Sequence, residues 1–378
     1  MNKNWDKKIF LVSNTSWSIL NFRLELIKAL KSRGYRVAAL APEDESVPEL
    51  KREAEHIPVK NLDRKSKNPI KEIKLFLEYL RVYKKEKPSL VINFTIKPNI
   101  YSSLACFMLG IPYISVITGL GYAFIKESPL TKLVSFLYRI SLKRAQRVLF
   151  LNPEDMDVFL RKKIIKEDNK ALMIYSEGVN TEHFSPDFCQ GLEKPKTKVF
   201  LLVSRLLWSK GVGEFVEATR VLKGKGYKFE SWILGPLDKE NPDAINESQI
   251  KEWQEEGVIK YLGSTRDVRP YLCKASCVVL PSYYREGIPR CLLEAMAMEK
   301  PIITADAPGC REVCFDGVNG FLVKPGDALC LAAVMEKVLN LSDEERINMG
   351  KEGRRIAVER FKVDKVVDIY LREIEKIF

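Results

Sequence analysis

The chain of 378 residues contains only two histidines, His56 and His183. Imidazole is the commonest metal ligand in proteins and the usual proton carrier near neutral pH. His56 precedes a short apolar segment, and His183 lies in a polar stretch between the two halves of the chain. We expect both to be structural, which excludes a catalytic centre built on histidine.

Recognisable metal-ligand motifs are lacking too, although the chain has eight cysteines. Two pairs, Cys273/Cys277 and Cys310/Cys314, have the spacing that can hold a metal on a helix. No histidine lies near either pair, so we expect no zinc site. The others are scattered, at Cys106, Cys189, Cys291 and Cys330.

Long apolar runs are missing as well. A membrane-spanning helix needs about 18 or more consecutive apolar residues, and no segment reaches that length. Residues 104–118 come closest, but Gly110-Ile111-Pro112 divides them into a helix and a strand. The first eight residues lead directly into an apolar segment, without the pattern of a secretory signal. We expect a cytoplasmic protein with reduced cysteines.

Acidic residues are outnumbered in one half of the chain only. Residues 1–185 carry 32 Lys and Arg against 20 Asp and Glu, whereas residues 186–378 carry 30 of each. The whole net charge of +12 therefore lies in the first half. Such asymmetry predicts an acidic partner, either nucleic acid or anionic lipid. An ordinary soluble basic face is the alternative.

Helical patterns alternate with short apolar strands along the whole chain. This alternation predicts an α/β fold with a parallel, doubly wound sheet in each half. Ligands of such sheets bind outside the carboxyl ends of the strands. The strands are expected at 8–13, 36–41, 56–59, 90–94 and 113–117, and then at 198–203, 230–234, 259–262, 277–280, 301–304 and 320–323.

Two carboxylates follow the strand predicted at 277–280. Glu286 lies on the strand-to-helix loop, and Glu294 lies within a helix predicted from Arg290 to Ala297. Eight residues make about 2.2 turns, so both acids lie on nearly the same face. Between them, Gly287-Ile288-Pro289 opens a helix whose free N–H groups can hold a phosphate. The arrangement predicts a nucleotide-sugar site; two glutamates on a solvated helix face are the alternative.

Three further segments add to this pattern. Arg205 and Lys210 lie on the loop after the strand predicted at 198–203, where they are either phosphate ligands or plain surface charge. The other two segments are residues 305–323, with Asp306-Ala-Pro-Gly309 and Asp316-Gly-Val-Asn-Gly320, and residues 176–184.

Together these four segments resemble the retaining glycosyltransferases of family 4, which have the GT-B fold. The resemblance covers nearly the whole chain. It implies two Rossmann-like domains facing across a cleft, at 1–185 for the acceptor and 186–360 for the nucleotide-sugar. It also implies that a helix at 361–378 crosses back to pack on the first domain.

The same resemblance implies a role for each motif residue. Arg205 and Lys210 would grip the diphosphate of a UDP-sugar, and Glu286 would contact hydroxyls of the donor sugar. Glu294 would hold the ribose, and the backbone of residues 287–290 would bind phosphate. Family members usually need no metal ion, because these cations replace it.

Loops of the first half supply further candidates. Thr118-Gly119-Leu120-Gly121 follows a predicted strand, and its two glycines permit close approach of a donor; an ordinary tight turn is the alternative. Asn21, at the end of the loop predicted at 14–21, Lys97 and Thr118 are candidates for binding the acceptor. The loop at 14–21 contains no glycine, although relatives often have a glycine-rich one.

Two predicted helices of the first half, at 69–85 and 128–147, combine an apolar stripe with many cations. Such helices can lie in a bilayer interface, or they simply pack on the sheet. Relatives that share the segments 94–101 and 117–122 build bacterial surface glycans, often on polyprenyl-diphosphate sugars. The resemblance therefore favours a peripheral protein of the inner membrane face.

The sequence thus predicts transfer of a hexose or N-acetylhexosamine from a UDP-sugar to a polyprenyl-diphosphate-linked glycan. A UDP-sugar epimerase of the same fold is one alternative. A basic nucleic-acid-binding protein is another, although it would not explain the paired cations and carboxylates, and no RNA-binding aromatic signature is present.

Overall fold

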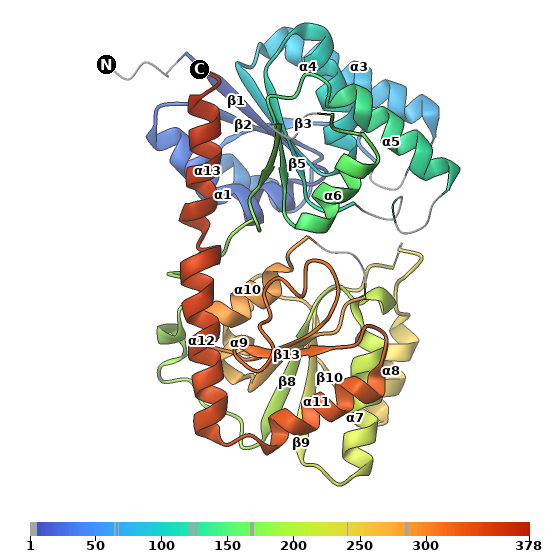
Figure 1. Ribbon diagram of the computed structural model, residues 1–378, viewed down its shortest axis with the longest axis vertical. Coiled ribbons are helices and arrows are strands. Elements are labelled where there is room, and N and C mark those ends of the chain that lie inside the picture. Colours follow the sequence, from blue (N-terminus) through green and yellow to red (C-terminus); the bar gives the residue numbers. More distant parts are fainter. Residues whose placement is uncertain are drawn as a thin grey trace. The chain divides into compact units, whose positions relative to one another are not determined.

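The computed structural model describes residues 6–63, 66, 68–120, 124, 128–166, 170–239, 241–283 and 287–378. The chain divides into two compact units (Figure 1). Unit 1 is Met1–Glu177 together with Val363–Phe378, and unit 2 is Gly178–Lys362. Among the described helices, none is both long and apolar enough to cross a bilayer.

Unit 1 is built on a parallel sheet of seven strands in the order β3-β2-β1-β4-β5-β6-β7. The strands are β1 (Lys8–Val12), β2 (Arg36–Ala41), β3 (Glu55–Pro58), β4 (Leu90–Phe94), β5 (Tyr113–Ile117), β6 (Arg147–Phe150) and β7 (Ala171–Met173). The helices are α1 (Ser16–Ser32), α2 (Val47–Glu53), α3 (Pro69–Glu86), α4 (Ser103–Leu109), α5 (Pro129–Ser141), α6 (Pro153–Arg161) and α13 (Val363–Glu375), and a π-helical turn (Pro98–Ser102) precedes α4.

Both faces of this sheet are buried, as the apolar strands predict. Side chains alternate along β1: Ile9 and Leu11 enter the core beneath α1 and α13, whereas Phe10 and Val12 enter the core beneath α3 to α6. Local signals fix the helix ends. Thr15 Oγ1 accepts from the N–H of Ser18 at the start of α1, in the usual manner of a helix cap.

Helix α13 belongs to unit 1 although it comes last in the sequence. It supplies Val366, Tyr370 and Ile374 to the core shared with α1. Glu373 of α13 is buried and pairs with Arg147 of β6 at 2.5 Å. Burial opposes ionisation of Glu373, but Lys376 and Arg147 outweigh it and lower its pKa. The predicted packing of the C-terminal helix on the first domain is confirmed.

Unit 2 has a parallel sheet of six strands in the order β10-β9-β8-β11-β12-β13. The strands are β8 (Lys198–Val203), β9 (Phe229–Leu234), β10 (Lys260–Tyr261), β11 (Cys277–Leu280), β12 (Ile302–Ala305) and β13 (Gly320–Val323). The helices are α7 (Val212–Gly224), α8 (Glu247–Glu255), α9 (Arg269–Lys274), α10 (Arg290–Ala297), α11 (Ala328–Asn340) and α12 (Asp343–Phe361). The predicted α/β class with two doubly wound sheets is confirmed.

One cysteine pair contradicts the expectation that the cysteines are reduced. Cys189, in a 3₁₀ turn at Pro186–Cys189, forms a disulfide with Cys273 of α9. Cys277 belongs to β11 rather than to the same helix, so the supposed Cys273/Cys277 metal spacing does not exist. This pair could not be predicted from sequence, because 84 residues separate its members.

Two predicted boundaries are wrong. The helix expected at 128–147 ends at Ser141, and Arg147 begins β6, where it pairs with Ile114 of β5. The loop expected at 14–21 is mostly helical because Thr15 caps α1. Asn21 therefore lies in the second turn of α1, and its side-chain amide donates to the Trp17 carbonyl at 2.9 Å.

Replacing Ile374 by alanine should destabilise the protein by about 2–5 kcal/mol, because it opens a cavity in a fully buried core. The free energy of unfolding would be measured by chemical denaturation. Arg372→Ala, on the exposed side of the same helix, is the matched control and should cost less than about 0.5 kcal/mol. Equal effects of the two changes would show that α13 is not part of the core of unit 1.

Candidate active site

The motif residues of unit 2 follow two neighbouring strands, β8 and β11, which pair in parallel. From β8 the strand order runs to β9 on one side and to β11 on the other. Such a reversal opens a crevice outside the carboxyl ends of the strands, where doubly wound folds bind ligands. Arg205 and Lys210 follow β8, and the start of α10 follows β11.

The loop after β8 is fitted closely to the loop after β11. Gly211 has a φ of +76°, and a Cβ atom there would lie 2.3 Å from the Pro281 carbonyl oxygen. Any larger residue would force the two loops apart. The Ser209 carbonyl also accepts from the Ser282 hydroxyl and from the Tyr283 amide, each at 3.1 Å. The two loops therefore form one platform.

Arg205 and Lys210 occupy different positions on this platform. Arg205 is half-exposed and pairs with Asp238, on the loop after β9, at 2.8 Å from Nη1 to Oδ2. Lys210 ends a 3₁₀ turn at Trp208–Lys210. Next to it, the amide of Ser209 donates to Asp243 Oδ2 at 3.0 Å. Asp238 and Asp243 thus hold the loop that carries the cations.

Helix α10 begins at Arg290, as predicted, and Pro289 before it has no polar side chain to cap the first amides. Glu294 is partly buried on this helix and pairs with Arg290 at 2.9 Å. Burial raises the pKa of Glu294, Arg290 partly offsets the rise, and Asp267 adds to it. Gly287 and Ile288 lie just before the helix, whereas Glu286 lies outside the described residues.

The candidates of the first half belong to unit 1. Thr118 and Gly119 follow β5, and Gly119 has a φ of +135°, which favours glycine. Gly121 lies outside the described residues. Thr95, which the sequence did not single out, ends β4 with a φ of +68°. Such a backbone is rare for a β-branched residue and is typical of functional edges.

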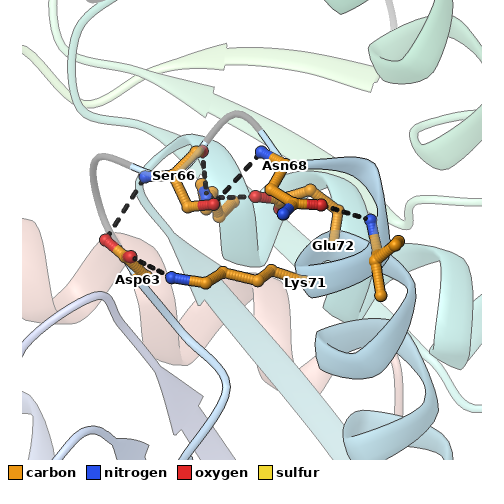
Figure 2. Close-up of polar contacts among 7 residues, drawn as sticks. Asp63, Ser66, Asn68, Lys71 and Glu72 are labelled. Atoms are coloured by element: carbon orange, nitrogen blue, oxygen red, sulfur yellow. Dashed lines mark hydrogen bonds and ion pairs between the residues drawn. The ribbon is translucent and has the colours of Figure 1, made fainter.

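Lys97 is already paired. Its ammonium contacts Glu72 of α3 and donates to the Ser66 carbonyl at 2.8 Å. Figure 2 shows the loop that provides these partners, in which Asn68 caps α3 and Lys71 reaches back to Asp63. Contact of Lys97 with an acceptor would therefore require this ion pair to open.

Neither histidine lies at the platform. His56 Nε2 lies 3.1 Å from Ser16 Oγ and 3.2 Å from the Ala41 carbonyl, and burial lowers the pKa of its ring. His183 packs edge-on against Phe184. The described part of the chain also holds no cluster of three or more His, Cys, Asp or Glu side chains placed to bind a metal.

Asp238, Asp243 and Asp267 were missed by the sequence argument. Each follows a strand of unit 2 at its carboxyl end, on a loop that carries no family motif. The only available signal was their position after β9 and β10, which is a weak one.

Two family models cover most of the chain. "Glycosyl transferases group 1" matches residues 186–356, and "Glycosyl transferase 4-like" matches residues 8–152. The first of these models spans all six strands of the sheet of unit 2, and the second spans β1 to β6 of the sheet of unit 1.

Two curated relatives are similar over most of their length. The chain is 31% identical to N,N'-diacetylbacillosaminyl-diphospho-undecaprenol alpha-1,3-N-acetylgalactosaminyltransferase of Campylobacter jejuni, over 98% of this chain and 100% of that one. It is 27% identical to UDP-Gal:alpha-D-GlcNAc-diphosphoundecaprenol alpha-1,3-galactosyltransferase of Escherichia coli, over 80% of each.

A solved structure shares the fold. Anabaena Alr3699/HepE, crystallised with UDP and glucose, superposes with a TM-score of 0.81 at 18% identity, covering 98% of this chain and 100% of that one. The two parallel sheets, the two family models and the full-length relative agree. The chain is therefore a group 1 glycosyltransferase of family 4, with the GT-B fold and the retaining chemistry of that family.

Proposed function

We propose that the enzyme transfers a hexose or N-acetylhexosamine from a UDP-sugar to a polyprenyl-diphosphate-linked glycan in bacterial glycan synthesis. The platform of unit 2 is the main support for a nucleotide-sugar donor. It places Arg205 and Lys210 on the loop beside the start of α10, the helix that carries the partly buried Glu294. Support for the acceptor comes from the two relatives above, whose names specify undecaprenol-diphosphate sugars.

Charge development explains the choice of residues. When the bond from the sugar to the phosphate breaks, negative charge grows on the β-phosphate. Arg205 and Lys210 would offset it without a metal ion, and the backbone N–H groups of Ile288 and Arg290 would add the positive end of α10. Glu286 would orient the donor sugar, and Glu294 would hold the ribose.

Unit 1 would provide the remaining contacts. In this proposal the backbone at Gly119 and Gly121 approaches the donor, and Thr118, Lys97 and Asn21 serve the acceptor. The structure makes Asn21 the weakest of these, because its amide is bound to the Trp17 carbonyl within α1.

The decisive experiment incubates the enzyme with a panel of UDP-sugars and a synthetic polyprenyl-diphosphate monosaccharide. Mass spectrometry should show an acceptor that is heavier by one hexose or N-acetylhexosamine. Release of UDP without any acceptor would favour an epimerase instead. Salt-sensitive binding to nucleic acid without UDP binding would favour the nucleic-acid alternative.

The surface of unit 1 supports a lipid-linked acceptor. Seven large apolar side chains are exposed on α3, α4 and α5, and α4 contacts both of the other helices. We call these side chains the apolar surface: Ile70, Ile73, Leu77, Met108, Leu133, Phe136 and Ile140. Exposed cations flank it, among them Lys74, Lys132 and Lys143. We propose that this surface rests on anionic lipid.

Replacing Arg205 or Lys210 by alanine should weaken UDP binding. Charge-assisted bonds to phosphate contribute roughly 1.5–3 kcal/mol each, or about 10- to 100-fold in Kd. Calorimetry with UDP measures the effect, and Arg355→Ala on α12 is a control that should change nothing. Unchanged affinity in both variants would place the diphosphate elsewhere.

Glu286→Ala should lower kcat by about 100-fold or more, because a carboxylate that binds the reacting sugar is lost. The melting temperature should stay the same, which separates catalysis from folding. Glu255→Ala, an exposed acid of α8, is the control. Near-normal turnover of Glu286→Ala would refute the assignment.

Binding to liposomes should require anionic lipid and should fall with added salt, because each cation near such a surface contributes about 1 kcal/mol. Leu133→Ser with Phe136→Ser, or Lys132→Glu with Lys143→Glu, should weaken flotation and leave transfer to a short soluble acceptor intact. Arg147 is unsuitable for this test because it pairs with Glu373. Lys351→Glu in unit 2 is the control. If the wild-type enzyme does not bind anionic liposomes at low salt, the apolar surface is only a solvent-exposed face and the proposed membrane contact is wrong.

A further inference from the structure

Arg290 lies at a position where a positive charge is normally unfavourable. It is the first residue of α10, at the positive end of the helix dipole, where acidic residues are normally favoured. A residue that is locally unfavourable at a ligand-binding edge often has a role in binding. The ion pair of Arg290 with Glu294 indicates that role.

The contact of Arg290 is directed at the acid proposed to hold the ribose. Arg290 Nε lies 2.9 Å from Glu294 Oε1, one helical turn further on. The side chains are only 25% and 13% exposed, so the pair is largely shielded from water. An exposed pair with this spacing would contribute little, but a shielded carboxylate without its partner would be costly.

A second acid, Asp267, increases the need of Glu294 for a positively charged partner. Asp267, on the loop between β10 and α9, raises the pKa of Glu294, adding to the effect of burial. Arg269 holds Asp267 in a fork, with Nε 2.9 Å from Oδ1 and Nη2 2.8 Å from Oδ2, and this bonding lowers the pKa of Asp267. Asp267 is therefore a fixed negative charge, and among the described residues Arg290 is the cation paired with Glu294.

We propose that Arg290 is a positioning residue that pairs with the Glu294 carboxylate and holds it in place at the donor site. The inference rests on the proposed function, in which Glu294 accepts hydrogen bonds from the ribose hydroxyls of a uridine nucleotide. Only an ionised carboxylate offers both oxygens as acceptors without a proton of its own.

The test compares Arg290→Met and Arg290→Lys with Arg355→Met. Arg355 forms the same i,i+4 pair with Glu359, but on the exposed surface of α12. Arg290→Met should raise the Kd for UDP and the KM for the UDP-sugar about tenfold at pH 7, with a smaller change in kcat. Arg290→Lys should recover most of the affinity, and Arg355→Met should behave as wild type.

The pH profile separates positioning from a merely structural role. Donor binding needs ionised Glu294, so kcat/KM falls as pH drops through the pKa of this carboxyl. Arg290 lowers that pKa, whereas burial and Asp267 raise it. Without Arg290 the pKa rises further, and the acid limb of the Arg290→Met profile moves to higher pH. An unmoved acid limb, with an unchanged KM, would overturn the inference.

A double-mutant cycle completes the test. Glu294→Gln alone should weaken UDP binding, but adding it to Arg290→Met should cost little more, because the two residues act as one unit. Fully additive losses would overturn the inference. If the wild-type enzyme does not bind UDP, the proposed function is wrong. If the wild-type enzyme binds UDP and Arg290→Met binds it equally well, only the inference about Arg290 is wrong.

Discussion

Parallel pairing of β8 with β11 is the interaction on which the site depends. Two segments nearly eighty residues apart in sequence end at the same edge of one sheet because these strands lie side by side. Neither the cations after β8 nor the start of α10 would form a site alone. Gly211 then lets the two loops approach so closely at Pro281 that no Cβ atom would fit between them.

Charges at this edge are arranged in pairs rather than left free. Arg205 pairs with Asp238, Arg269 with Asp267, and Arg290 with Glu294. Partly buried charges without partners would destabilise the fold. Their pairing also fixes their directions before a ligand arrives, which is the condition for electrostatic catalysis. The proposed donor site is therefore organised by contacts that already exist within unit 2.

The sequence predicted what depends on local patterns. Short apolar strands separated by helices gave both sheets, and α10 begins and ends at Arg290 and Ala297 as expected. It failed where a distant partner decides the outcome. Arg147 looked like one more cation of a long helix, but it is a strand residue bound to Glu373, 226 positions away. Asn21 was predicted to lie in a loop, but Thr15 caps α1 so that the helix begins at Ser16, earlier in the chain than expected.

The same limit applies to the site. Arg205, Lys210 and Glu294 could be proposed from the sequence because they belong to a motif that resembles that of the family. Asp267 and Asp238 act only through space, on loops whose sequences carry no pattern. The disulfide between Cys189 and Cys273 could not be predicted for the same reason.

The place of α13 in unit 1 has a consequence for synthesis of the chain. Unit 2 is a continuous segment, Gly178–Lys362, and all of it is translated before α13. Unit 1 is translated first, yet the side of its sheet that α13 covers stays open to water until Val366, Tyr370 and Ile374 emerge. Although domains usually mature in the order of translation, here the first domain to be made is the last to be finished. In the meantime its exposed apolar face is a surface for chaperones to protect.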